Sequence, residues 1–411
     1  MTLDSSAQRR DLAIVIYSTF PHASGGRETW LARMLPALAA AGFRTTVYAK
    51  APPPSAPAVH TLPAETALRQ VGSTRTRPAM LRRALLNAPV AYGIATFQRR
   101  TAAALEADGF GGGVVLGLGS IIEVATALRL RRRYPGTRVV CAVHGRAARE
   151  LSHSLPWARP LLGTMERRAL RACDAVVANG DDTRQWLASF GVTSTVVPNG
   201  VDARAFAAGS AETPPLLAEA RERGEAVLSM VATLRDIKGI RPFIQALPAL
   251  RARFGPHFRA VFVGKGNAEP YRRYARRHGV EDRVSFVGEQ SDVLPWLRGS
   301  DVSVNLSGGT GMAIAAIEAL AAGVPVAAWD SPIYRQIIDP EHTGILVPEG
   351  DTEALAAALA RLLGDGELRS RLSAAGAAAA PRFDWAEATP GLLAVLEAVF
   401  DVDPREGASL P

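Results

Sequence analysis

The stretch VSVNLSGGTGMAIAAIEALAAGVPVAA, residues 302–328, decides the fold. It opens with a short apolar run, Val302–Asn305, which predicts a buried strand. A glycine-rich loop follows, and an alanine-rich run from about Gly311 predicts a helix. The next apolar run, Pro325–Ala328, predicts a second strand. Two buried strands joined by a helix form a β-α-β unit of a parallel sheet.

The same alternation continues in both directions along the chain. Runs of four to six residues, most of them rich in valine and isoleucine, are separated by segments of helix length. Such strands are typical of parallel sheets that helices cover on both faces. The other expected strands are Leu12–Tyr17, Thr45–Tyr48, Val114–Leu118, Val139–Val143, Ala175–Ala178, Val227–Val231, Ala260–Val263, Val284–Val287 and Gly344–Val347.

The length of 411 residues favours two domains. The alternation restarts after a turn cluster, Pro198–Asp202, and we interpret residues 203–224 as a linker. The expected organisation is a Rossmann-like domain over residues 1–203 and a second one over 204–385. A helix and tail, 386–411, are expected to pack back on the first domain.

The composition points to an ordinary folded α/β protein. Hydrophobic residues make up 48% and charged residues 21%, which excludes extensive disorder. Two cysteines, Cys141 and Cys173, predict neither a disulfide framework nor a metal cluster. A polar start without a signal-peptide pattern predicts a cytoplasmic location.

The net charge of +8 comes almost entirely from arginine, which makes it weak evidence about partners. The arginine runs lack interleaved aromatic residues, so nucleic acid is not an expected partner. Solvated helix faces explain the runs most simply, and a peripheral membrane contact of the first domain is the alternative. Because Lys50, Lys238 and Lys265 are the three lysines of the chain, each of them is more informative than usual.

Two charged residues lie where open α/β sheets bind ligands. Lys238 and Gly239 follow the strand expected at Val227–Val231, and a flexible ammonium there suits a diphosphate. Glu318 falls two turns into the alanine-rich helix, and a carboxylate in an apolar run needs a partner such as a pair of ribose hydroxyls. A solvated lysine and a solvent-facing glutamate are the simpler alternatives.

A paired glycine, Gly25-Gly26, lies between the first strand and the first helix. Backbone amides there can approach an anionic or sugar ligand. A tight turn without a ligand explains the same pair. The spacing does not match the dinucleotide-binding fingerprint.

In their order and spacing these features resemble the retaining GT-B glycosyltransferases known as family four. The motifs that carry the resemblance are Gly25-Gly26, Asp174–Asn179, Val197–Asp202, Leu234 with Lys238-Gly239, Val263–Gly266, Val284–Gly288 and Glu318–Val326. The resemblance implies the α/β fold class and two facing, doubly wound Rossmann-like domains. The first would bind the acceptor and the second the donor.

The resemblance also assigns roles to individual residues. Lys238 would bind the donor diphosphate, Glu318 the ribose, and His144 would lie near the reacting sugar. As a bare sequence feature, a histidine at a strand end is more often structural. The other implied donor contacts are Thr310, the amides of Gly311, Met312, Ala313 and Ile314, the backbone of Val287, Gly288 and Glu289, and the Gly25 and Gly26 loop, which would lie under the diphosphate or the acceptor.

Three positions depart from the family pattern. Thr233 stands where the family has an arginine that helps to neutralise the leaving diphosphate, and Arg235 is a candidate to supply that charge. Thr310 stands where the family has a glutamate that touches donor-sugar hydroxyls, which would fit an unusual donor sugar or weak or absent activity. Gln336 replaces a common glutamate.

The implied activity is transfer of a sugar from a nucleotide-diphosphate sugar to an acceptor hydroxyl, with retained configuration and without a metal or cofactor. UDP is the default base, and the acceptor is a small molecule, a glycan or a lipid-linked glycan. A nucleotide-sugar epimerase on the same fold is one alternative. A non-catalytic protein that binds nucleotide sugars is the other.

Overall fold

The computed structural model describes residues 10–22, 26–53, 58–71, 88–145, 147–148, 158–209, 212–308 and 313–401. The chain divides into two compact units. The N-terminal unit contains residues up to Asn199 together with those from Ala388 onward, and the C-terminal unit spans Gly200–Glu387. No helix among these residues is long and apolar enough to cross a membrane.

The N-terminal unit is built on a parallel sheet of seven strands in the order β3-β2-β1-β4-β5-β6-β7. Its strands are β1 (Arg10–Ile16), β2 (Phe43–Lys50), β3 (Ala67–Val71), β4 (Val114–Gly117), β5 (Arg138–Val143), β6 (Ala175–Ala178) and β7 (Thr195–Val196). The central strands β4 and β5 are buried on both faces, which explains their unbroken apolar sequences.

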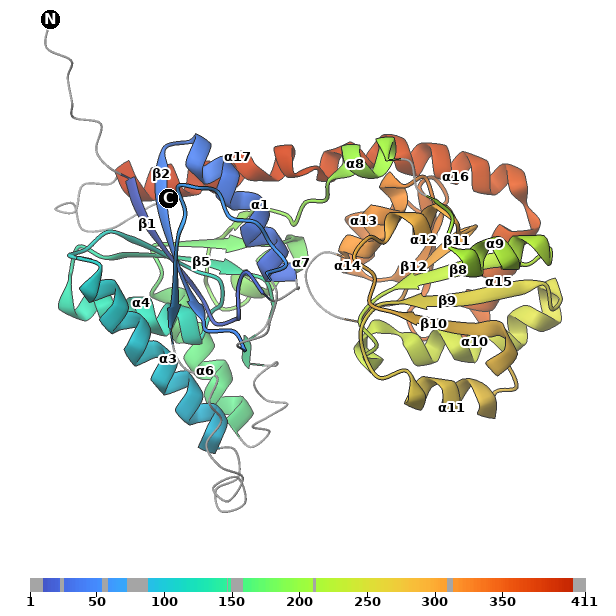
Figure 1. Cartoon of the computed structure of the whole chain (residues 1–411), viewed down its shortest axis with the longest axis horizontal. Coiled ribbons are helices and arrows are strands. Elements are labelled where there is room, and N and C mark those ends of the chain that lie inside the picture. The colour runs from blue at the N-terminus through green and yellow to red at the C-terminus, as the bar shows by residue number, and fades with distance from the viewer. Residues whose placement is uncertain are drawn as a thin grey trace, which may run out of the picture. The chain divides into compact units, whose positions relative to one another are not determined.

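Helices cover both faces of this sheet (Figure 1). They are α1 (Gly26–Ala40), α3 (Ala88–Ala107), α4 (Ile122–Arg133), α6 (Arg159–Arg171), α7 (Asp181–Ala188) and α17 (Trp385–Asp401), of which α17 belongs to this unit from Ala388. Alternate strand residues, including Val139 and Cys141, pack against α3, α4 and α6. Arg10 pairs with Glu397 of α17 at 3.3 Å, and the rings of Phe43 and Phe400 lie 5.5 Å apart.

The C-terminal unit contains a parallel sheet of six strands in the order β10-β9-β8-β11-β12-β13. The strands are β8 (Ala226–Val231), β9 (Phe258–Val263), β10 (Val284–Gly288), β11 (Val302–Asn305), β12 (Val326–Asp330) and β13 (Gly344–Pro348). Val227 packs with helix α9, whereas Leu228 and Met230 join the core cluster of helix α10. Both faces of β8 are therefore buried, as its apolar sequence predicts.

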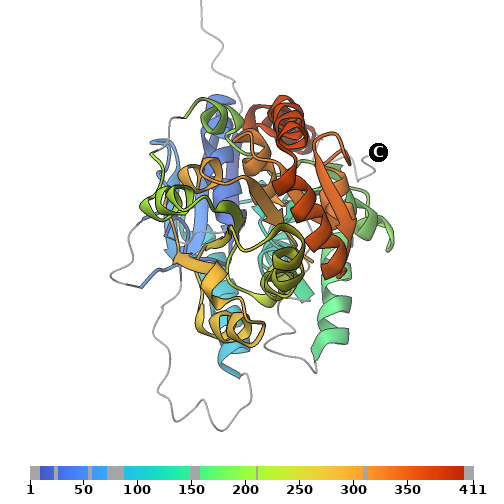
Figure 2. The ribbon, with the colours of Figure 1, turned by 90° about the vertical axis from the view of Figure 1, so that its right-hand side faces the viewer.

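Figures 1 and 2 show helices on both faces of this second sheet. They are α8 (Ala203–Ala208), α9 (Pro215–Glu222), α10 (Ile240–Phe254), α11 (Glu269–Arg277), α12 (Leu294–Arg298), α13 (Ile314–Ala321), α14 (Pro332–Arg335), α15 (Thr352–Gly364) and α16 (Gly366–Ala379). Short 3-10 turns lie at η2 (Asp236–Lys238), η3 (Glu281–Arg283) and η4 (Ala380–Phe383).

Every strand predicted from the sequence is present, with small differences at the ends. Two strands were not predicted, β3 and β7. The interpretation of residues 203–224 as a linker is wrong, because α8 and α9 pack in the C-terminal unit. Ala203, Leu217 and Ala220 are buried there. Both cysteines are free.

Each sheet reverses its strand order once. In the N-terminal sheet β1 lies between β2 and β4, and in the C-terminal sheet β8 lies between β9 and β11. In an open parallel sheet, the loops that follow the two central strands diverge at such a reversal and leave a crevice at their carboxyl ends. The loops after β1 and β4, and those after β8 and β11, are therefore the places to look for a site.

Candidate functional site

In the C-terminal unit, the loops after β8 and β11 touch each other closely at Gly239. Gly239 has φ +77° and caps helix α10, and a β-carbon on it would lie 2.5 Å from the carbonyl oxygen of Leu306. The amide of Gly308 donates a hydrogen bond to the carbonyl oxygen of Ile237 at 2.9 Å. Glycine at position 239 is therefore required both by the backbone angle and by the space available.

Lys238 bridges the same two loops. It ends the turn η2, is half-buried, and its Nζ donates to Oγ of Ser307 at 3.4 Å. Burial lowers the pKa of Lys238, and the nearby Arg235 guanidinium lowers it further. Arg235 itself is exposed. A partly desolvated ammonium at the strand-order reversal is suited to bind a phosphate group.

Glu318 lies in helix α13, two turns from the loop after β11. Burial raises the pKa of Glu318 to about 7, and the negative charge of Asp292 contributes to the rise. Within the described parts of the chain, no hydrogen bond or ion pair occupies its carboxylate. A half-buried carboxylate without a partner is an acceptor that a pair of ligand hydroxyls could satisfy.

Several residues predicted to contact the donor fall outside the described residues, namely Gly25, Thr310, Gly311 and Met312. Ala313 and Ile314 are described: Ala313 precedes the first turn of α13, and Ile314 begins the helix. The amide of Ala316 is the first in the helix to donate to a backbone carbonyl, that of Ala313 at 2.9 Å. The first N–H groups of a helix have no partner within the helix, so those of Ile314 and Ala315 are candidates to bind a ligand.

The segment predicted to contact the base lies at the end of β10. Val287 is half-buried, and Gly288 and Glu289 are exposed. The carbonyl oxygen of Gly288 accepts a hydrogen bond from the amide of Gly264 at 2.8 Å, which ties the loop after β9 to this segment. Glu289 pairs with Lys265 at 3.5 Å.

In the N-terminal unit, a buried carboxylate organises the loops after β1 and β4. Glu123 Oε1 accepts a hydrogen bond from the amide of Tyr17 at 3.0 Å and pairs with Arg27 at 3.4 Å. Arg27 also donates to the carbonyl oxygen of Leu118 at 3.2 Å. Because Arg27 follows Gly26 in the first turn of α1, these bonds fix the start of the helix at the carboxyl edge of the sheet.

A second buried carboxylate, Glu166 of α6, holds the neighbouring loops. It accepts hydrogen bonds from Ser120 Oγ at 2.6 Å and from the amide of Ala147 at 2.8 Å. Sequence reasoning missed Glu123 and Glu166, since each lies within a helix and nothing in the local sequence shows that it is buried. An acidic residue on the apolar face of a predicted helix is the one signal that could have identified them.

His144 follows β5, and its ring lies edge-on to the ring of Trp30 with centroids 4.8 Å apart. Burial lowers the pKa of His144 to about 3, the positive charge of Arg27 lowers it further, and the Asn199 amide opposes both. In the described part of the structure, both ring nitrogens of His144, Nε1 of Trp30 and Oδ1 of Asn199 are buried without a hydrogen-bond partner. These polar atoms could form hydrogen bonds with the hydroxyl groups of a ligand.

A metal site and a separate cavity are the two alternatives to these loops. Among the described residues, no group of three or more histidine, cysteine, aspartate or glutamate side chains could hold a metal ion. A cavity of about 420 Å³ lies at the amino end of β6 and is lined by Cys173, Asp174 and Ser194 among others. It lies at the opposite edge of the sheet from His144 and Glu123, and so is not where a doubly wound sheet is expected to bind its substrate.

Comparison with known proteins agrees with this geometry. The family model described as Glycosyltransferase Family 4 matches residues 24–205, and the one described as Glycosyl transferases group 1 matches residues 225–365. A phosphatidyl-myo-inositol mannosyltransferase of Mycobacterium leprae is 30% identical over 272 residues, which are 64% of this chain and 67% of the relative. Other relatives of the same name are matched over 57% to 59% of their length.

Solved structures show the same fold over nearly the whole chain. A sucrose-phosphate synthase of Thermosynechococcus elongatus superposes with a TM-score of 0.78 at 20% identity, covering 95% of this chain and 99% of that one. HepE of Anabaena, solved in complex with UDP-glucose, has a TM-score of 0.70 at 16% identity, with 94% and 99% covered. The two parallel-sheet units, the two family matches and these likenesses lead to one conclusion: the chain belongs to the GT-B glycosyltransferases.

Proposed function

We propose that the chain transfers a sugar from a nucleotide-diphosphate sugar to an acceptor hydroxyl, with retained configuration and without a metal ion. One observation carries the proposal, namely the bridge from Lys238 Nζ to Ser307 Oγ across the strand-order reversal. It presents an ammonium group to the crevice in which such sheets bind ligands. The C-terminal unit is the donor unit in this proposal, and the N-terminal unit is the acceptor unit.

On the donor side, Lys238 binds the diphosphate and Arg235 adds positive charge. Because Thr233 carries no charge where the family has an arginine, most of the charge stabilisation falls on Lys238 and on the amides from Gly311 to Ile314. Glu318 accepts the ribose hydroxyls. The backbone of Val287, Gly288 and Glu289 contacts the base.

On the acceptor side, the Gly25-Gly26 loop would lie under the diphosphate or the acceptor, and His144 would lie near the reacting sugar. The bond between the anomeric carbon and the diphosphate oxygen breaks, and the acceptor oxygen forms its bond on the same face. The acceptor proton passes to the leaving phosphate oxygen, so the reaction needs no side-chain base. Catalysis then consists of positioning and of stabilising the charge on the leaving diphosphate.

The relatives guide the choice of substrates. UDP is the default base, and a structural neighbour was solved with UDP-glucose. A mannosyltransferase that acts on a phosphatidyl-inositol makes a lipid-linked acceptor a reasonable first choice, beside small molecules and glycans. We place the protein in the cytoplasm, where nucleotide sugars are made.

A peripheral membrane contact fits one surface of the N-terminal unit. On helix α6, Leu161 is 59% exposed and Met165 44% exposed, one turn apart. Arg159, Arg167 and Arg168 are exposed on the same helix, and none of them forms an ion pair with a described residue. Apolar side chains among unpaired arginines suit the headgroup region of an anionic bilayer.

Vesicle sedimentation tests this contact. Changing Arg167 and Arg168 to glutamine should weaken binding to phosphatidylglycerol-containing vesicles roughly 30-fold. The matched control removes two exposed arginines, Arg273 and Arg277, from helix α11. Equal loss in both double variants, or equal binding to pure phosphatidylcholine, contradicts a role for α6.

The activity itself is tested with the Lys238→Ala variant. Calorimetric titration with UDP, GDP, dTDP and ADP identifies the base, and nucleotide release with and without acceptors measures transfer. We expect Lys238→Ala to lose most turnover and to keep its circular dichroism spectrum, while Arg253→Ala, on an exposed face of α10, behaves as the wild type. Turnover that is insensitive to EDTA is expected as well. Wild-type turnover in Lys238→Ala would contradict the assignment of Lys238 to the diphosphate.

The two alternatives give different results in the same assay. An epimerase converts the donor sugar without any acceptor. A non-catalytic member binds one nucleotide and does not release it from the donor sugar. Thr233 and Thr310, which depart from the family pattern, would explain that outcome.

A further inference from the structure

Tyr334 is a buried residue whose hydroxyl reaches the loop after β11. It lies in helix α14, between β12 and β13, and is 1% exposed. Its Oη accepts a hydrogen bond from the amide of Ser307 at 2.8 Å. Burial raises the pKa of Tyr334 well above its usual range, so the hydroxyl stays neutral at working pH.

Ser307 links Tyr334 to Lys238. Its backbone amide is bound by Tyr334, and its Oγ accepts the hydrogen bond from Lys238 Nζ at 3.4 Å. No other hydrogen bond to the Lys238 ammonium occurs among the described residues. The position of Ser307 therefore decides where the ammonium group rests before a ligand arrives.

Among the described residues of this loop, Leu306 and Gly308 make further contacts. Gly308 donates to the carbonyl oxygen of Ile237 at 2.9 Å, and Leu306 packs against Gly239. These contacts hold the loop to the turn that carries Lys238. The bond to Tyr334 comes from another element, α14, and so anchors the pair of loops to the sheet.

We propose that Tyr334 is a positioning residue for the diphosphate site: through Ser307 it fixes the place at which Lys238 meets the donor. The proposal rests on the proposed function, in which Lys238 binds the diphosphate. Tyr334 touches neither donor nor acceptor. Its effect is expected on ligands that carry a diphosphate and not on those that lack one.

The Tyr334→Phe variant removes the hydroxyl and keeps the ring. We expect roughly tenfold weaker binding of UDP or GDP, whichever the wild type prefers, since one hydrogen bond in this chain of contacts is lost. The affinity for the matching nucleoside, uridine or guanosine, should change by less than about twofold, because the nucleoside has no diphosphate for Lys238 to bind. The donor KM should rise, and kcat at saturating donor should fall because Lys238 also stabilises the leaving diphosphate, while the acceptor KM should stay close to wild type.

Tyr48→Phe is the matched control. Tyr48 is 2% exposed, and its hydroxyl donates to Asp108 Oδ2 at 2.9 Å in the N-terminal unit. The Tyr48→Phe variant therefore loses a comparable buried hydrogen bond at a place away from the proposed donor site. Tyr48→Phe should lower the melting temperature as Tyr334→Phe does and leave nucleotide affinity unchanged.

Ser307 provides the second arm of the test. Ser307→Ala should weaken diphosphate binding as Tyr334→Phe does, and Ser307→Thr, which keeps the hydroxyl, should restore most of it. In the Lys238→Ala background, Ser307→Ala should have no further effect, because it acts through Lys238.

The outcomes separate the two proposals. A wild type that binds no nucleoside diphosphate overturns the proposed function. A wild type that binds, with Tyr334→Phe equal to it, overturns the role of Tyr334 alone. Equal weakening of nucleotide and nucleoside in Tyr334→Phe shows a general structural effect and overturns it as well.

Discussion

The backbone of Gly239 lies so close to Leu306 that a β-carbon at position 239 would fall 2.5 Å from the Leu306 carbonyl oxygen. Leu306 and its neighbours form the loop that presents Ser307 to Lys238. The close approach is thus what allows two loops, far apart in sequence, to act on one ligand.

Gly239→Ala should therefore damage both stability and donor binding. The new methyl group forces the two loops apart, and we expect a loss of at least about 3 kcal/mol of unfolding free energy together with weaker nucleotide binding. The control is Gly279→Ala, which has φ +66° and no atom within 4 Å of the added carbon. It should lose about 1 kcal/mol from the backbone angle alone. Chemical denaturation measures both, and equal losses contradict the steric explanation.

Glu318→Gln should raise stability at high pH and lower nucleotide affinity. The pKa of Glu318 is raised to about 7 in the folded protein, above its ordinary value of 4.5. Stability is therefore full below about pH 4.5 and falls as pH rises through 7, by about 3 kcal/mol. The glutamine variant lacks this loss, so its melting temperature relative to the wild type should increase from pH 5 to pH 8.

The ionisation of Glu318 should also make nucleotide affinity depend on pH. An ionised Glu318 accepts ribose hydroxyls better than a protonated one, so wild-type nucleotide affinity should rise between pH 6 and pH 8, across the pKa of about 7. Titrations at several pH values test this. An identical rise in Glu318→Gln assigns it to another group.

His144 should remain neutral throughout the working range. Its pKa is lowered to about 3, chiefly by burial. The folded value lies below the unfolded one, so the stability linked to this residue is present above pH 6.5 and declines as pH falls below it. NMR spectra of the histidine rings, assigned with a His144→Gln variant, should show no titration of His144 between pH 5 and pH 8. A midpoint near 6.5 would mean that the ring is solvated.

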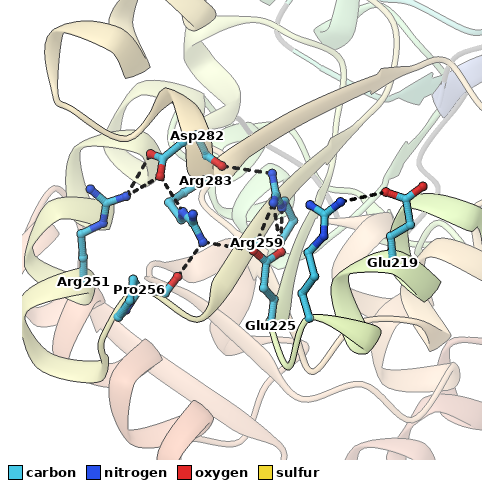
Figure 3. A network of polar contacts seen from close by, with 8 residues as sticks. Glu219, Glu225, Arg251, Pro256, Arg259, Asp282 and Arg283 are labelled. Carbon is cyan, nitrogen blue, oxygen red and sulfur yellow. Dashed lines mark hydrogen bonds and ion pairs between the residues drawn. The ribbon is translucent and has the colours of Figure 1, made fainter.

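Glu225 should be critical for stability and neutral for activity. It accepts hydrogen bonds from Arg259 at 3.0 Å and from Arg283 at 3.1 Å, at the amino ends of β8, β9 and β10 (Figure 3). Its side chain is 7% exposed. Glu225→Gln removes the charge partner of Arg259, while Arg283 keeps its pair with Asp282 at 2.9 Å, and it should cost about 3 kcal/mol of unfolding free energy.

Figure 3 also contains the control for Glu225. The pair between Glu219 and Arg223 spans 3.4 Å, with both side chains at least 60% exposed. Glu219→Gln should change stability by less than about 1 kcal/mol. Similar losses in the two variants, or a changed nucleotide affinity in Glu225→Gln, contradict this picture.

The strands were predictable because parallel strands covered on both faces carry an unbroken apolar sequence. β3 was not, since it is an edge strand in which Arg69 and Gln70 are exposed. Arg69 pairs with Asp108 at 2.9 Å, a contact between residues far apart in sequence. β7 contains just two residues, too short for any pattern. Residues 203–224 were mistaken for a linker because the alanine, glycine, serine and proline residues before Pro215 are typical of one.

The site divides in the same way. Lys238 and Glu318 could be proposed from the sequence because a lysine beside a glycine and a carboxylate in an apolar helix are visible locally. Tyr334 and Ser307 are separated by 27 positions, and no local pattern connects them. The contact depends on α14 packing beneath the loop after β11, and that is a property of the tertiary structure.

The ion network around Glu225 lies at the end of the sheet opposite to Lys238. β8 has six residues, so the two ends are roughly 20 Å apart. In the proposed function, substitutions in the loops after β8 and β11 change the donor preference, and most substitutions destabilise a protein. Because the network occupies the far end, such changes leave it untouched. The chain can thus explore other sugars, in nature or in directed evolution, without disturbing the part that keeps the donor unit folded.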